Sequence, residues 1–89
     1  MRADRQKIER LLKTARGQMD GLLRMVEEDR YCIDISNQIM AAQAILKNAN
    51  REILKAHLSG CVREAFEEGG DAPAQKVEEI VSVFDKLTK

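Results

Sequence analysis

The stretch that decides the fold covers residues 33–66 and reads IDISNQIMAAQAILKNANREILKAHLSGCVREAF. Apolar residues recur in it at alternating spacings of four and three, and it contains no proline. The series consists of Ile35, Ile39, Ala42, Leu46, Ala49, Ile53 and Ala56. This spacing places the residues on one side of an α-helix and is typical of a coiled-coil seam. It therefore predicts one long helix over about 33–66, about 50 Å in length at 1.5 Å per residue.

A shorter helix is expected on the N-terminal side, over about 4–28. Its apolar positions are Ile8, Leu12, Ala15, Met19, Leu22 and Val26, with Leu11 and Leu23 beside them. On the C-terminal side, Gly69-Gly70 stops the long helix, and Asp71 followed by Pro73 opens a third helix over about 73–87. This third helix is expected to bury Val77, Ile80, Val81 and Phe84.

The composition describes one small domain over residues 1–89 that needs a partner. The chain has 89 residues, no Trp and only three aromatic residues, so a protomer on its own has little core to bury. A long helix between two shorter ones leaves apolar surface uncovered. We therefore predict an all-α protein of three helices that dimerises as an antiparallel four-helix bundle. No apolar run approaches the roughly 20 residues of a membrane span and the N-terminus is charged, so a cytoplasmic location is expected.

The charges cancel in number but not in position. The chain has 15 Lys and Arg against 15 Asp and Glu. Residues 1–16 are mostly basic, whereas residues 62–79 are mostly acidic. A basic segment of this kind can hold phosphate. The alternative interpretation is a solvated helix face with intrahelical ion pairs such as Glu9–Lys13.

Two cysteines and one histidine are the candidate chemistry. His57 and Cys61 are four residues apart, so on a helix they share one face and can converge on one ion. Cys32 lies 29 residues before Cys61, about 43 Å along a continuous helix, which excludes a site within one chain. Antiparallel packing of two long helices brings Cys32 of one chain level with His57 and Cys61 of the other. Two such sites follow from two-fold symmetry.

The ligand set favours a soft ion. Two thiolates and one imidazole complete a trigonal site for Cu(I), whereas Zn(II) needs a fourth ligand. An iron–sulfur cluster needs more cysteines than the chain offers. The alternative is structural: small buried cysteines and a core or surface histidine. An enzyme is not expected, because no base–nucleophile pair, C-x-x-C motif or phosphate loop is present.

Four short motifs resemble one known family. They are RGQMDG at 16–21, YCID at 31–34, Gln38 with the alanine-rich stretch after it, and His57-Leu58 with Cys61. Over about residues 5–85 the chain resembles the copper-sensitive operon repressor family of bacterial transcriptional regulators. The resemblance implies an all-helical dimer that associates into a homotetramer, binds operator DNA without metal and releases it when Cu(I) binds.

The resemblance also implies roles for individual residues. Cys32, His57 and Cys61 match the copper ligands of the family. Tyr31 and Glu79 match the tyrosine and glutamate that lie beside the ligands. A metal-bound histidine offers its second ring nitrogen to a partner, and Glu79 is a candidate for that partner. Without such roles, Tyr31 caps a bundle end and Glu79 is a solvated charge.

The residues that contact the operator are harder to identify than the metal ligands. Two positions that are commonly basic in the family are Leu11 and Asn48 in this chain. Basic residues nearby are the candidates for DNA binding: Arg10, Lys13, Arg16, Lys47 and Arg51. No motif that reads a DNA groove is present, so phosphate contacts and DNA shape are expected to dominate.

Two alternatives to copper sensing remain at this point. Cys32 and Cys61 also match the cysteine pair of persulfide-sensing members, which form a bridge between protomers and do not need the histidine. A purely structural helical oligomer is the second alternative. Nickel, cobalt and formaldehyde sensing are disfavoured, since the chain lacks the extra histidines and the N-terminal proline associated with them.

Overall fold

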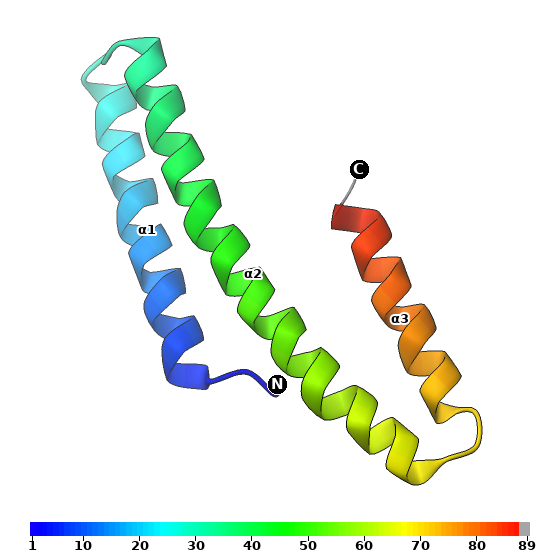
Figure 1. Ribbon diagram of the computed structural model, residues 1–89. Coiled ribbons are helices and arrows are strands. Elements are labelled where there is room, and N and C mark those ends of the chain that lie inside the picture. The colour runs from blue at the N-terminus through cyan, green and yellow to red at the C-terminus, as the bar shows by residue number, and fades with distance from the viewer. Residues whose placement is uncertain (88–89) are drawn as a thin grey trace. The chain divides into compact units, whose positions relative to one another are not determined.

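The computed structural model describes residues 1–87, without the side chains of Cys61, Val62 and Leu87. Within this range the chain forms three helices and no strand: α1 (Arg5–Glu27), α2 (Cys32–Glu68) and α3 (Ala72–Leu87) (Figure 1). The all-helical prediction with one long central helix is confirmed. The expected boundaries at 4–28, 33–66 and 73–87 differ from these by one or two residues at most. No helix in the described range is long and apolar enough to cross a membrane.

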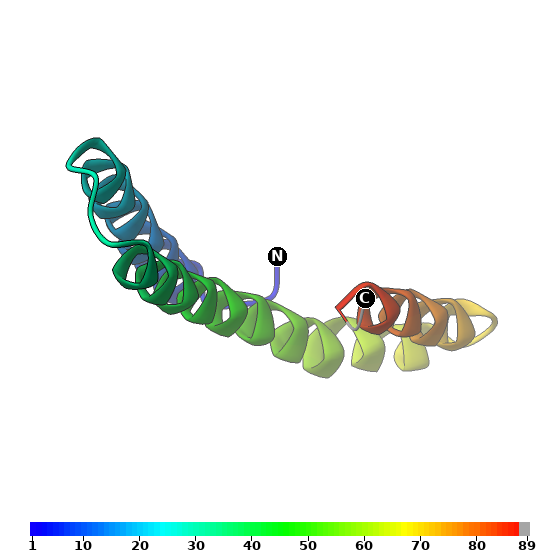
Figure 2. The ribbon, with the colours of Figure 1, turned by 90° about the horizontal axis from the view of Figure 1, so that it is seen from above.

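The helices contribute to two compact units. The first unit covers Asp4–Glu52, in which α1 runs antiparallel beside the first part of α2 (Figures 1 and 2). The second unit contains Met1–Ala3 together with the chain from Ile53 onward. In it the last part of α2 and α3 form a second antiparallel pair. We refer to them as the α1 unit and the α3 unit.

Asp4 begins α1 as a side-chain cap. Its carboxylate oxygen Oδ1 accepts hydrogen bonds from the backbone N–H groups of Gln6 and Lys7 at 3.0 and 3.4 Å. Its own backbone carbonyl accepts the first helical bond, from Ile8 at 3.0 Å. These bonds satisfy N–H groups that have no partner inside the helix, and such a cap contributes about 1 kcal/mol.

The two turns between helices use different residues in the left-handed backbone region. After α1, Asp29 has a φ of 54°, and Arg30 N–H donates back to the carbonyl of Met25 at 3.0 Å. After α2, Gly69 and Gly70 have φ values of 76° and 62°. Glycine adopts this region without a steric penalty, whereas aspartate pays one.

The α1 unit is held by a seam of small and medium-sized residues. On α1, Ile8 and Ala15 are buried, and Leu11, Gln18, Leu22 and Met25 are half-buried. On α2, Ala42 and Ala49 are buried, and Ile35, Gln38, Ile45 and Glu52 are half-buried. Alanines at these positions let the two backbones approach closely. Lys7 Nζ and Glu52 Oε1 lie 3.2 Å apart at one end of the seam.

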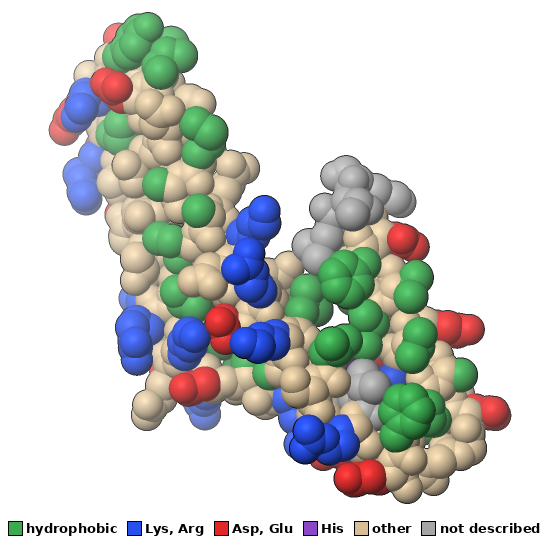
Figure 3. Space-filling model, in the orientation of Figure 1, with side chains coloured by type: hydrophobic (Ala, Val, Ile, Leu, Met, Phe, Trp, Pro, Cys, Tyr) green, Lys and Arg blue, Asp and Glu red, His purple; other side chains and the backbone are tan. Residues whose placement is uncertain are grey.

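A second apolar stripe of the α1 unit is uncovered, and we call it the outer stripe. Figure 3 shows hydrophobic side chains exposed at several places on the face that it displays. The outer stripe consists of Leu12, Met19, Leu23 and Val26 on α1 and of Ile39 and Leu46 on α2, all exposed. The sequence placed these residues in the same apolar series as the buried ones. In the structure only some members of the apolar series are buried, because each helix has only one neighbouring helix in this unit.

The α3 unit also leaves apolar side chains exposed to solvent. Val77, Val81 and Phe84 were expected to be buried, but each is about half-exposed, and only Ile80 is half-buried. This prediction is wrong for the single chain, because α3 packs against one helix and a helix–helix contact hides only one narrow stripe.

Candidate metal centre

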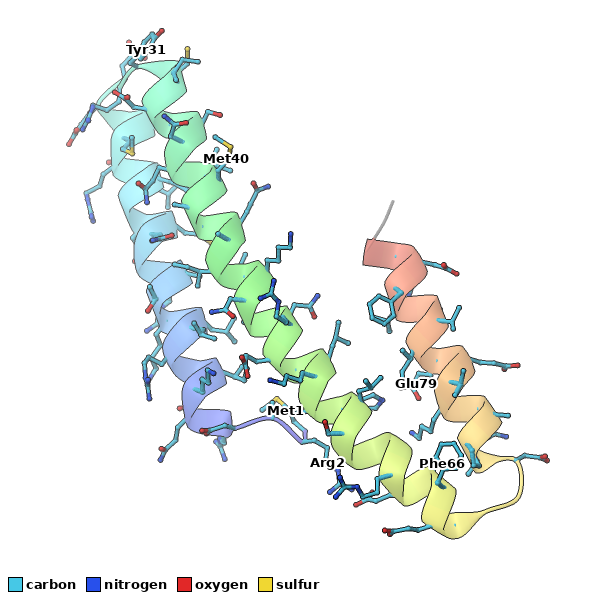
Figure 4. All side chains as sticks on the ribbon, viewed as in Figure 1. Met1, Arg2, Tyr31, Met40, Phe66 and Glu79 are labelled. Carbon is cyan, nitrogen blue, oxygen red and sulfur yellow. The ribbon has the colours of Figure 1, made fainter. Side chains whose placement is uncertain are left out.

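His57 and Glu79 meet in the α3 unit. His57 projects from α2 and is 27% exposed, while Glu79 projects from the side of α3 that faces α2 (Figure 4). The distance between His57 Nε2 and Glu79 Oε1 is 3.6 Å. At that separation the pair is a near contact rather than a hydrogen bond.

The imidazole has an orphaned nitrogen. His57 Nε2 is buried and has no hydrogen-bond partner among the described residues, so Glu79 is the nearest acceptor that they offer. No described residue forms a hydrogen bond with Nδ1. A hydrogen bond from Nε2–H to Glu79 would fix the proton on Nε2 and leave the lone pair on Nδ1. This is the arrangement that a metal-binding histidine requires.

Lys76 holds the other oxygen of the same carboxylate. Its Nζ lies 3.4 Å from Glu79 Oε2, one turn earlier on α3. The sequence-based reasoning missed this residue, although its i,i+3 spacing to Glu79 is a recognisable signal for an ion pair. Lys76 therefore orients Glu79 while His57 approaches from α2.

The cysteines are distributed over both units. Cys32 is exposed with a free thiol at the first position of α2, in the α1 unit. Cys61 lies on α2 four residues after His57, and its side chain is outside the described part of the chain. Tyr31, 66% exposed, precedes Cys32, and its carbonyl accepts a hydrogen bond from Ile35 N–H at 3.2 Å.

No complete metal site forms among the described side chains of one protomer. No group of three or more His, Cys, Asp and Glu residues lies close enough together to hold an ion there. The structure brings His57 and Glu79 together but does not join Cys32 or Tyr31 to them. A metal site that includes His57 would therefore need ligands from outside the described part of the protomer.

The five candidate DNA-binding residues lie in the α1 unit and are exposed. They are Arg10, Lys13 and Arg16 on α1 and Lys47 and Arg51 on α2. None of them forms an ion pair with any residue in the described range. By contrast, Arg5 and Lys7 are paired with Glu9 and Glu52. These five cations are therefore available to an anionic partner, as are other exposed cations without an ion pair in the described range, such as Arg24 on α1.

Comparison with known proteins identifies the family. The family described as "Metal-sensitive transcriptional repressor" matches residues 4–86. The chain belongs to this family of repressors.

Two relatives and one solved structure carry names that specify the metal. The chain is 41% identical over 86 residues to the copper-sensing transcriptional repressor CsoR of Bacillus subtilis, covering 97% of this chain and 83% of that protein. It is 42% identical over 78 residues to CsoR of Mycobacterium ulcerans, covering 86% and 67% of the two chains. The crystal structure of CsoR with Cu(I) from Geobacillus thermodenitrificans matches with a TM-score of 0.88 at 38% identity, covering 94% of this chain and 85% of that one.

Membership of this family has two consequences for the predictions. A transcriptional repressor acts through DNA, so operator DNA is its partner. It is a regulator rather than an enzyme, as the sequence predicted.

Proposed function

We propose that this repressor responds to Cu(I). It binds operator DNA without metal and releases it when Cu(I) is bound by Cys32 of one protomer and by His57 and Cys61 of its partner. Support comes from the relatives named as copper-sensing repressors and from the similarity to a CsoR structure solved with Cu(I).

The observation that carries the proposal is the pairing of His57 with Glu79. A buried Nε2 within 3.6 Å of a carboxylate, with an unoccupied Nδ1, suits a histidine that ligates through Nδ1. The donor set also fits the ion, because two thiolates and one imidazole complete a three-coordinate Cu(I) site. Copper supplies the bonds that join the two protomers. The chain's own residues orient His57 and exclude competing hydrogen bonds.

The division of the site between two chains follows from α2. This helix is continuous from Cys32 to Glu68, so it separates Cys32 from His57 along one chain. An antiparallel partner presents its own His57 and Cys61 near Cys32. The exposed thiol of Cys32 is accessible to such a partner. The exposed outer stripe gives the two chains an apolar surface on which to associate.

Regulation then rests on a difference in affinity. Cu(I) favours the conformation in which Glu79 contacts His57, and operator DNA favours the conformation that presents the basic residues of the α1 unit. Each ligand weakens the binding of the other by the same factor. A change from mostly bound to mostly free operator requires about 3 to 5 kcal/mol of coupling.

The test measures operator release in parallel with Cu(I), Zn(II) and a persulfide donor under anaerobic conditions. We expect one Cu(I) per protomer and release with Cu(I) alone. His57→Ala should keep the operator in the presence of Cu(I). Release by the persulfide donor, unchanged in His57→Ala and accompanied by a covalent dimer in mass spectrometry, would falsify the copper assignment in favour of sulfur sensing.

A further inference from the structure

A polar groove of about 500 Å³ lies on the α1 unit, between α1 and the first part of α2. Gly17 and Gly21 line it on α1, and Arg24 and Arg30 line it toward the turn that follows this helix. Glu28 is the one acidic residue of the described lining, and its carboxylate lies 3.8 Å from the guanidinium of Arg30. The groove therefore carries a net positive charge, whereas the outer stripe is apolar.

The two glycines of the groove are not required by packing within the protomer. A glycine in the interior of a helix is destabilising relative to alanine, so its presence needs a compensation. At Gly17 an added Cβ would meet no described atom within 4 Å, and at Gly21 it would meet only the guanidinium of Arg24, at 3.8 Å. The compensation is then a molecule outside the protomer that approaches α1 closely at this point.

The outer stripe does not account for the glycines either. Met19 and Leu23 follow Gly17 and Gly21 by two residues, and two residues correspond to about 200° around an α-helix. A partner chain that covers the outer stripe therefore lies on the opposite side of α1 and does not fill the groove.

Cations extend along α1 in line with the glycines. Arg10 and Lys13 precede Gly17 by seven and four residues, and Arg24 follows Gly21 by three. Residues at these spacings share one face of a helix. All three cations are exposed and form no ion pair in the described range. A gap in the side chains with cations at both ends admits a phosphate group close to the helix backbone, where the arginines can pair with it.

Gln18 adds an unpaired carboxamide to the groove. Its Oε1 is buried and has no hydrogen-bond partner among the described residues. Buried polar atoms of folded proteins are normally paired, so an unpaired one indicates a missing partner. A carboxamide has both an acceptor and an N–H donor, and a half-turn of the group exchanges them. In that second orientation Gln18 can donate a hydrogen bond to a phosphate oxygen.

We infer that this groove binds the sugar–phosphate backbone of operator DNA. Gly17 and Gly21 admit the strand, and Arg24 and Arg30 pair with its phosphates. The inference rests on the proposed function and adds a shaped contact to the five candidate DNA-binding cations. Net positive charge favours DNA over a second copy of the chain as the occupant, because the surface suited to a second copy is the apolar outer stripe.

The experiment measures the affinity of the copper-free full chain for operator DNA, together with the free energy of unfolding. Gly17→Gln fills the groove with a neutral side chain that favours helix. It should weaken operator binding by about tenfold or more, as the loss of a charge-assisted hydrogen bond does. The free energy of unfolding should stay equal or rise, because the added side chain meets no described atom and glutamine is the better helix former. A glycine with a merely structural role would lose stability and DNA binding together.

Two further variants test charge and specificity. Arg24→Ala should weaken operator binding by up to about tenfold and reduce the slope of log affinity against log salt by about one, as the loss of one phosphate contact does. Ala74→Gln is the matched control for Gly17→Gln, because it introduces the same side chain at an exposed helical position of the α3 unit. It should bind the operator as the unaltered chain does.

Three results would overturn the inference. The first is an operator affinity of Gly17→Gln equal to that of the unaltered chain, whatever Arg24→Ala does. The second is a loss of affinity in Ala74→Gln as large as in Gly17→Gln. The third is a change of oligomeric state in Gly17→Gln, measured by sedimentation equilibrium, which would make the groove a contact between copies of the chain.

Copper separates this inference from the proposed function. An unaltered chain that binds the operator through the groove, but keeps it when Cu(I) is added, overturns the copper response alone. An unaltered chain that releases the operator in Cu(I), with Gly17→Gln binding it equally well before copper is added, overturns the groove contact alone.

Discussion

The α1 unit and the α3 unit are both antiparallel helix pairs with exposed apolar side chains and ion pairs, and they differ in which candidate functional residues they carry. In the α1 unit the candidate DNA-binding cations are exposed and unpaired within the described range, and the outer stripe is apolar. In the α3 unit charged side chains are drawn into contacts: Arg2 with Glu64, and both Lys76 and His57 with Glu79. The first unit carries the cations proposed for DNA binding, and the second carries the histidine proposed for copper binding.

Under the proposed function, this difference assigns copper binding by His57 and DNA binding to separate parts of the chain. The candidate ligand Cys32 is the exception, because it is exposed at the first position of α2, in the α1 unit. A copper ion bound to Cys32 of one chain and His57 of another therefore joins an α1 unit to the α3 unit of a partner.

The division of ligands between chains predicts complementation. Cys32→Ala alone and the double variant His57→Ala, Cys61→Ala alone should each lose Cu(I)-induced operator release. Removing a residue that hydrogen-bonds to a metal ligand lowers metal affinity by about 10- to 100-fold. Each of these variants removes a ligand itself, so its loss of copper affinity should be larger. Mixing the two variants should restore release, because the heterodimer holds one intact site. The measurement is operator release by fluorescence anisotropy during Cu(I) titration.

A site contained within one chain predicts the opposite for the mixture, namely no recovery at any mixing ratio. The control is the Cys32→Ala variant mixed with itself after the same unfolding and refolding treatment, which should stay inactive. Recovery in that control would show that the treatment, and not the shared site, restores release.

The outer stripe should hold the protomers together. Leu23, 62% exposed in the single chain, is its most exposed member. Burying a leucine side chain stabilises by about 1.5 to 3 kcal/mol, and a two-fold interface contains the residue twice. Leu23→Glu should therefore raise the dimer dissociation constant by about 100-fold or more. Sedimentation equilibrium measures it, with Gln43→Glu as an exposed control on α2. Equal dissociation constants for the two variants would show that the stripe is not the interface.

The extent of each helix was readable from the sequence, whereas the choice of buried face was not. The seven-membered series from Ile35 to Ala56 fixes a long helix whatever packs on it. The series includes both Ala42, which is buried, and Leu46, which is exposed. Both belong to one broad apolar surface, and periodicity does not show which part meets the neighbouring helix. The close approach at Ala42 and Ala49 decides it, and that is a tertiary property.

The candidate site shows the same limit. The i,i+4 spacing of His57 and Cys61 indicated a half-site, and family resemblance pointed to Glu79, which lies 3.6 Å from the imidazole. In the α3 unit the Arg2 side chain packs beside Gly60, and this contact had no such signal, because it joins residues nearly sixty positions apart and involves no repeated pattern. Contacts of that kind depend on where the chain folds back.

The unpaired cations of the α1 unit should determine operator affinity without copper. Arg16→Ala and Arg51→Ala should each weaken operator binding by up to about tenfold. If each residue contacts one phosphate, each variant should also reduce the slope of log affinity against log salt by about one. Arg63→Ala, which alters a cation of the α3 unit, is the matched control. A loss in Arg63→Ala as large as in Arg16→Ala would contradict the assignment of DNA binding to the α1 unit.

The smallest effect concerns the two turns. Asp29 pays a steric cost at its φ of 54° and places a negative charge at the C-terminus of α1, where the helix dipole disfavours it. Glycine removes both costs but gains freedom in the unfolded chain, so Asp29→Gly should raise the free energy of unfolding by only about 0.5 to 1 kcal/mol. Gly69→Asp introduces the same residue at a φ of 76° in the α3 unit and should lower it by about 1 kcal/mol. Urea unfolding monitored by circular dichroism at fixed protein concentration measures both. If both variants change the free energy of unfolding in the same direction, the strain attributed to Asp29 does not arise from its backbone conformation. The hydrogen bonds around Arg30 and Met25 would then be what stabilises the turn.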